Sequence, residues 1–141
     1  MMTYERKAYY HETDQMGVIH QSNYLRWLEE SRIFFLDSLG LSYKKLEEMG
    51  IISPVVSIKI DYIKPVRFDD VVLINLKVIK YTGVKMIFSY EIIDKENKEL
   101  RIKAESSHCF TDGKSVISFK REKPELHKII DDYVNSSNDM E

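Results

Sequence analysis

A chain of 141 residues is long enough to bury a substantial hydrophobic core and short enough to form a single domain. Its net charge of -2 provides no electrostatic reason to bind nucleic acid or an anionic membrane. The single cysteine, Cys109, has no partner for an intramolecular disulfide, which fits a reducing compartment. The N-terminus lacks the apolar core of a signal peptide, and no apolar run approaches the roughly 18 residues of a membrane span. We therefore expect a cytoplasmic protein without membrane insertion.

The first expected element is an imperfect strand from about Thr3 to Tyr10, and a polar, turn-rich loop follows it. The next stretch is the only long one with helical spacing of apolar residues. Ser22 or Asn23 is suited to cap this helix, and Gly40 is suited to end it. The expected buried face of the helix consists of Leu25, Leu28, Arg32, Leu36 and Leu39.

The loop before this helix contains a carboxylate, Asp14, followed three residues later by Gly17, which permits a sharp turn. The helix N-terminus comes within about eight residues of Asp14 and concentrates unpaired N–H donors that can hold an oxyanion. This arrangement predicts that Asp14 takes part in catalysis. The alternative is that Asp14 only forms the turn. Glu12 precedes it by two residues and is expected to point in a different direction.

The run Asp14-Gln15-Met16-Gly17-Val18-Ile19, followed by Ser22 to Glu30, resembles the signature of hotdog-fold acyl-CoA thioesterases of the 4-hydroxybenzoyl-CoA thioesterase-like family. Pro54-Val55-Val56 and the segment from Pro65 to Val71 are similar to that family too. The resemblance implies an α+β fold in which an antiparallel, curled β-sheet wraps around one long α-helix. It also implies hydrolysis of an acyl-CoA by a homodimer or homotetramer, with no cofactor other than the coenzyme A of the substrate.

The remaining sequence agrees with such a fold. A short second helix is expected from Leu41 to Gly50, after which the apolar period changes from 3.6 to 2. Consecutive strands joined by hairpins predict an antiparallel meander; we expect them at Val56–Tyr62, Val72–Val78, Val84–Ile92, Leu100–Phe110 and Ser115–Phe119. Pro124 is suited to begin a C-terminal helix. The expected domain covers residues 1–134, with a flexible tail at 135–141.

By resemblance, Asp14 matches the family's catalytic carboxylate, which acts as a nucleophile or a general base depending on the member. Many relatives have histidine or tyrosine at the position of Gln21. A neutral amide cannot relay protons, so we expect Gln21 to act through its backbone N–H. His20, one place earlier, is expected to be a buried, hydrogen-bonded residue. A metal site formed by His11, Asp14 and His20 lacks further ligands, and none is predicted.

The candidate substrate-binding residues are Tyr24, Glu29, Lys64, Arg67 and Lys85. Relatives carry an acidic residue at the position of Glu29, whereas a surface ion pair between Glu29 and Arg32 is the alternative. The three basic residues are candidates for contacts to coenzyme A phosphates. Each of them could instead be an ordinary solvated charge.

Two other functions remain open at this stage. A hotdog hydratase or dehydratase would need a histidine paired with a carboxylate, and its usual motif is not visible. A non-catalytic acyl-CoA-binding protein is the second alternative, because a fold does not by itself determine function.

Overall fold

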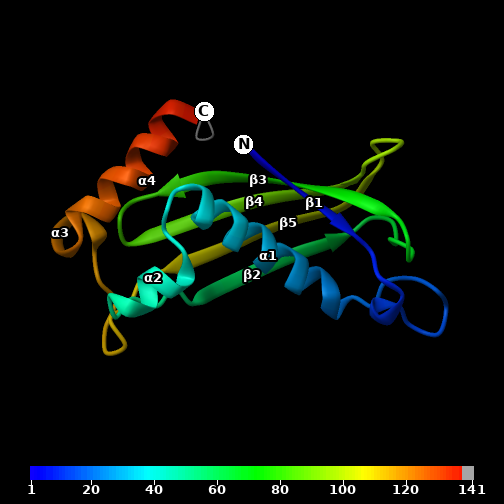
Figure 1. The fold of residues 1–141 in the computed structure, drawn as a ribbon, viewed down its shortest axis with the longest axis horizontal. Coiled ribbons are helices and arrows are strands. Elements are labelled where there is room, and N and C mark those ends of the chain that lie inside the picture. Colours follow the sequence, from blue (N-terminus) through cyan, green and yellow to red (C-terminus); the bar gives the residue numbers. More distant parts are fainter. Residues whose placement is uncertain (138–141) are drawn as a thin grey trace.

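The computed structural model describes residues 1–137 of the chain as one antiparallel sheet that curls around a long helix, α1 (Figure 1). The strand order is β1-β3-β4-β5-β2, so β1 and β2 form the two edges. The strands are β1 (Met2–Lys7), β2 (Val55–Tyr62), β3 (Val71–Tyr81), β4 (Lys85–Asp94) and β5 (Leu100–Cys109). The helices are η1 (Tyr10–Glu12), α1 (Ser22–Ser38), α2 (Tyr43–Glu48), α3 (Phe119–Glu122) and α4 (Pro124–Ser137). The predicted α+β class and curled antiparallel sheet are confirmed.

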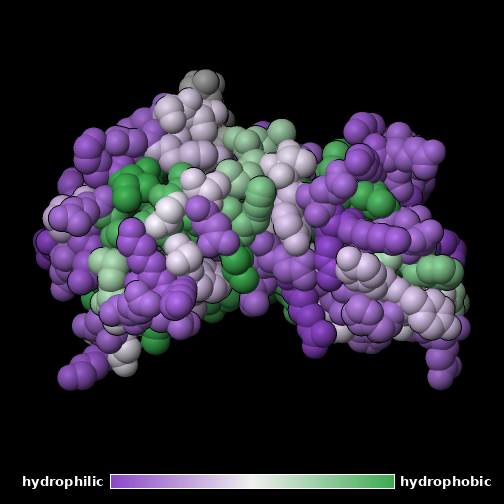
Figure 2. Space-filling model, viewed as in Figure 1, coloured by the Kyte–Doolittle hydropathy of each residue, from purple (hydrophilic) through white to green (hydrophobic). Residues whose placement is uncertain are grey.

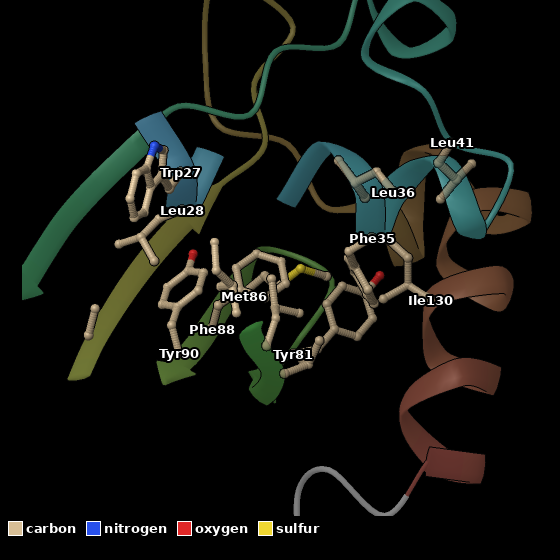
Figure 3. Close-up of a cluster of buried hydrophobic side chains, with 14 of the residues drawn as sticks. Trp27, Leu28, Phe35, Leu36, Leu41, Tyr81, Met86, Phe88, Tyr90 and Ile130 are labelled. Atoms are coloured by element: carbon tan, nitrogen blue, oxygen red, sulfur yellow. The ribbon is translucent and has the colours of Figure 1, made fainter. Parts of the chain in front are cut away.

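The core lies between α1 and the concave side of the sheet. Figure 3 shows Trp27, Leu28 and Phe35 of α1 pointing toward side chains of the strands. The Phe35 ring meets the edge of the Phe88 ring at a centroid distance of 5.5 Å. Ile130 of α4 closes the end of the core near Phe35 (Figure 3). The predicted alternation is confirmed from Val72 to Val78 in β3 and from Met86 to Ile92 in β4, where every second residue is buried. Val84, which was expected on the same buried face, is 39% exposed and precedes β4.

The start and the buried face of α1 differ from prediction. Gln21, rather than Ser22 or Asn23, is the residue before the first turn. The Asn23 side chain instead donates to the backbone oxygen of Glu12 at 3.0 Å. Leu25 is 44% exposed, because the aromatic rings of α1 fill the concave sheet and turn the helix so that Leu25 lies outside. The buried residues are Asn23, Tyr24, Trp27, Leu28, Ser31, Arg32, Phe35 and Leu36. Gly40, with φ of 77°, ends the helix as predicted.

The predicted strand at Ser115–Phe119 is wrong. This segment forms one isolated bridge between Thr111 and Val116, and α3 then begins at Phe119. The Phe119 ring stacks on Phe110 at 3.9 Å, and this buried contact ends the extended segment early. Helix α4 continues through Ser137, past the expected boundary at residue 134, and the rest of the expected tail lies outside the described residues. No helix among residues 1–137 is long and apolar enough to cross a membrane.

Candidate functional site

A pocket of about 410 Å³ opens where the N-terminal end of α1 meets the end of β2. In Figure 1 this region lies toward the right, beside the blue loop that connects η1 to α1. The pocket brings together four of the predicted site residues from three separate segments of the chain. Its lining consists of Asp14, Ile19, His20, Gln21, Tyr24, Tyr62, Ile63, Lys64 and Pro65.

The half-buried Asp14 forms a turn and lines the pocket at the same time. Its Oδ1 accepts hydrogen bonds from the backbone N–H of Met16 at 2.7 Å and of Val18 at 3.4 Å. Within residues 1–137, no hydrogen bond reaches the other carboxylate oxygen, Oδ2. The two roles considered for Asp14 are therefore compatible, because one oxygen holds the loop and the other is available to a bound molecule.

Gly17 has the backbone conformation that its place in the loop predicted. Its φ is 77°, in the left-handed region that favours glycine, and its N–H donates to the Asp14 carbonyl at 3.3 Å. No heavy atom lies within 4 Å of the position that a Cβ would take. A side chain at this position would therefore strain the backbone without clashing with a neighbour.

We expect Gly17→Val to reduce activity much more than thermal stability, because a strain of roughly 1–2 kcal/mol would displace the turn that holds Asp14. The measurement is kcat together with the melting temperature. Gly113→Val is the matched control, since Gly113 also has a positive φ and open space but lies in a distant hairpin. Equal effects of the two variants on kcat would contradict this role of Gly17.

The N-terminal end of α1 presents unpaired donors beside the carboxylate. Within the described part of the chain, the backbone N–H of Gln21 has no hydrogen-bond acceptor, and the Gln21 side chain makes no capping bond. His20 is exposed rather than buried, and its Nδ1 lies 2.8 Å from the Ser22 hydroxyl. The Ser22 N–H also points to this nitrogen at 3.2 Å, so the imidazole caps the first turn. The Gln21 N–H is thus available to polarise a carbonyl group.

Glu12 is a buried anchor that holds the loop, a role that sequence reasoning missed. Its Oε2 lies 2.8 Å from Arg6 Nη2 of β1 and accepts from Trp27 Nε1 of α1 at 2.9 Å. Its Oε1 accepts from the backbone N–H of Tyr9 at 2.9 Å. Burial tends to raise the pKa of the Glu12 carboxyl, but the bonds from Trp27, Tyr9 and Arg6 outweigh it and lower that pKa. The only signal for this role in the sequence was that Glu12 lies two residues before Asp14. This spacing indicated that the two side chains point in different directions.

The two candidate substrate-binding residues on α1, Tyr24 and Glu29, have different environments. Tyr24 lines the pocket, yet its hydroxyl accepts a hydrogen bond from the Val66 N–H at 3.1 Å and thereby holds the opposite wall. Glu29 is exposed on the outer face of the helix and is not among the residues that line the pocket. The pair considered between Glu29 and Arg32 does not form, because the Arg32 side chain is buried and donates to the Tyr90 hydroxyl at 3.1 Å.

The basic candidates do not form one cluster. Lys64 lines the pocket but pairs with Glu99 at 2.8 Å, and the exposed Arg67 follows on the same loop, where its backbone bridges to Val18. Lys85 begins β4 and lies opposite Cys109 at the far end of β5. The pocket end of β5 lies about 23 Å from there, as seven residues of strand separate Cys109 from the partner of Tyr62. Within one chain, Lys85 is therefore not at the pocket.

Potential metal ligands do not gather in the described region. Among residues 1–137, no group of three His, Cys, Asp or Glu side chains could hold a metal ion. The His11 ring stacks on Tyr9 with a centroid distance of 5.7 Å, outside the pocket lining.

Comparison with known proteins shows which family this chain is similar to. The family model of the thioesterase-like superfamily matches residues 10–131. The chain is 38% identical over 125 residues to YneP of Bacillus subtilis, a protein provisionally named as an acyl-CoA thioesterase, covering 87% of this chain and 90% of that protein. It is 30% identical over 107 residues to a 1,4-dihydroxy-2-naphthoyl-CoA hydrolase of Synechocystis, covering 75% and 78%. The structure of a DHNA-CoA thioesterase from Staphylococcus aureus superimposes with a TM-score of 0.87 at 31% identity, covering 96% and 93%.

Proposed function

The chain belongs to the thioesterase-like superfamily with a hotdog fold, and from this premise we propose that it hydrolyses an acyl-CoA thioester to a free acid and CoA. The observation that carries the proposal is a pocket lined by both Asp14 and Gln21, where an available carboxylate oxygen and an unpaired N–H occur together. A thioester needs these two groups, a base or nucleophile and a donor to its carbonyl oxygen.

Asp14 can act in two ways that need the same negative charge. As a nucleophile, its Oδ2 attacks the thioester carbon, the C–S bond breaks, CoA leaves as the thiolate, and water hydrolyses the acyl anhydride. As a general base, Asp14 instead takes a proton from a water molecule that attacks the same carbon. In both routes the carbonyl oxygen gains negative charge, which the Gln21 N–H and the positive end of the α1 dipole stabilise.

A thiol-release assay with short, long and aromatic acyl-CoAs tests the proposal. We expect release of CoA well above the uncatalysed rate for at least one acyl group. Binding without turnover of any acyl-CoA would favour the non-catalytic alternative. Loss of enoyl-CoA absorbance without thiol release would favour a hydratase.

We expect Arg67→Ala and Lys64→Ala to raise KM with little change in kcat, because contacts to CoA phosphates bind substrate and transition state equally. The effect should decrease at high salt, which screens exposed charges. Lys85→Ala is the matched control, since Lys85 lies at the far end of the sheet. An unchanged KM in both test variants would place the phosphate site elsewhere.

We further propose that two copies of the chain pair through β2. This strand is an open edge of the sheet, and Val55, Val56, Ile58 and Tyr62 are exposed on it. Exposed apolar edges favour pairing with another strand. Because Tyr62 also lines the pocket, such pairing would place the second copy beside the site. Light scattering should give a dimer or tetramer, and a mass of about 17 kDa at micromolar concentration would contradict the pairing.

A further inference from the structure

The structure contains a buried positive charge without an opposite charge. The Arg32 residue is 6% exposed, and its Nη1 donates to the Tyr90 hydroxyl at 3.1 Å. The Tyr43 hydroxyl is close enough to the guanidinium to contribute to its raised pKa, whereas the Arg32 Nε is buried and has no partner. Among residues 1–137, no carboxylate forms an ion pair with Arg32. Burying an unpaired charge is costly, so an acceptor for this guanidinium is expected in the functional state.

The neighbours of Arg32 are polar but supply no negative charge. The Tyr90 hydroxyl lies 2.5 Å from Ser106 Oγ, which lies 2.7 Å from Nε2 of His108. Burial raises the pKa of the Tyr90 hydroxyl, which stays neutral. Burial and then the Arg32 charge lower the pKa of His108 to about 4, so the imidazole is neutral as well. We call these four residues, together with Tyr43, the Arg32 cluster; its net charge at neutral pH is positive.

A strip of β2 connects the Asp14 pocket with the Arg32 cluster. Tyr62 pairs with Ile102, Ile60 with Ala104 and Ile58 with Ser106, and directly opposed residues share one face of the sheet. That face is the one covered by α1, because Ser106 belongs to the Arg32 cluster and the Tyr24 and Tyr62 rings are in contact.

The strip is open at both ends. In a single copy of the chain, Tyr62, at the pocket, is 52% exposed, and Ile58, beside Ser106, is 38% exposed. Four residues of strand span about 13 Å. Figure 2 shows hydrophobic residues at the surface of the face that carries α1, among hydrophilic ones.

One member of the Arg32 cluster borders a hollow, although the other four are buried. Besides its contact with Arg32, Tyr43 lines a second hollow, of about 140 Å³, between α2 and the segment before β2. Figure 3 shows the Tyr90 hydroxyl pointing away from the sheet toward α1. The end of the strip away from the Asp14 pocket, at Ile58, lies opposite Ser106 of the cluster.

We propose that the Arg32 cluster binds a carboxylate at the far end of the acyl group, so that the preferred substrates are CoA thioesters of dicarboxylic acids. This inference rests on the proposed function. The apolar strip suits a methylene chain, and a chain of about ten carbons spans the distance of about 13 Å. A carboxylate satisfies the orphan Nε and neutralises the guanidinium in one contact. A terminal hydroxyl provides only the hydrogen bond, and a terminal methyl group provides neither.

The test compares three acyl-CoAs of equal length that end in a carboxylate, a hydroxyl or a methyl group. For the wild type we expect kcat/KM to decrease in that order, with at least about a tenfold difference between the first and the last. Arg32→Met removes the charge but keeps the length of the side chain, and it should abolish or reverse the order while the methyl-ended substrate is still hydrolysed. Arg26→Met is the matched control, since Arg26 is exposed on the same helix and its loss changes the net charge equally. It should leave the order unchanged.

Several outcomes would overturn the inference. Equal kcat/KM values of the wild-type enzyme for the methyl-ended and the carboxylate-ended substrate would overturn it. This outcome does not depend on whether Arg32→Met folds. An unchanged order in Arg32→Met would also overturn it, because the charge of Arg32 would then play no part in the choice of acyl group. Failure to hydrolyse any acyl-CoA at all would instead refute the proposed function.

Discussion

Asp14→Asn is expected to lower kcat for thioester hydrolysis by at least about a thousandfold, which corresponds to about 4 kcal/mol. The amide oxygen of asparagine can still accept the Met16 N–H, so the turn should persist. The variant lacks the negative charge that a nucleophile or a general base needs. The measurement is single-substrate turnover, together with the melting temperature and the affinity for acyl-CoA. Both of these should stay close to the wild-type values.

Gln21→Ala is the companion variant because it keeps the backbone N–H while it removes the side chain. We expect a loss of less than about tenfold, or 1.4 kcal/mol. Loss of a true oxyanion donor would instead cost about 3–4 kcal/mol. An active Asp14→Asn enzyme would refute the assignment of Asp14, and an inactive Gln21→Ala enzyme would mean that the amide side chain takes part.

Glu12→Ala is expected to destabilise the fold by about 3–5 kcal/mol, because it breaks a buried ion pair and leaves several donors without an acceptor. Glu12 is 5% exposed, and its carboxylate joins β1, η1 and α1 through Arg6, Tyr9 and Trp27. The measurement is the free energy of unfolding from urea denaturation. Because η1 directly precedes the Asp14 loop, kcat of the remaining folded enzyme should fall as well.

Glu30→Ala provides the control for this anchor. Glu30 pairs with the same Arg6 at 2.8 Å, but its side chain is 34% exposed. Exposed pairs contribute little, so we expect a loss of less than about 1 kcal/mol. If the two variants were equally stable, the burial of Glu12 would not be what holds the loop.

Most of the strands and the turn between Asp14 and Gly17 could be predicted because short-range rules determine them. The period of two in β3 and β4 predicted which residues are buried, since side chains of a strand alternate between its faces. Gly17, three residues after Asp14, predicted a tight turn, and the structure has the positive φ that such a turn needs. The α+β class followed from one helical stretch among several hairpin-connected strands. These are properties of residues that are neighbours in the chain.

Contacts between distant segments could not be predicted in this way. The exposure of Leu25 depends on how the rings of α1 fit the curvature of the sheet. The distance of Lys85 from the pocket depends on the strand order, and so does the open edge at β2. Glu12 is buried because Arg6 and Trp27 come from other elements to meet it. The sequence shows which groups are present, but only packing decides which of them meet. Each such contact joins segments that are far apart in the chain, and a local pattern of residues does not determine where two such segments lie in space.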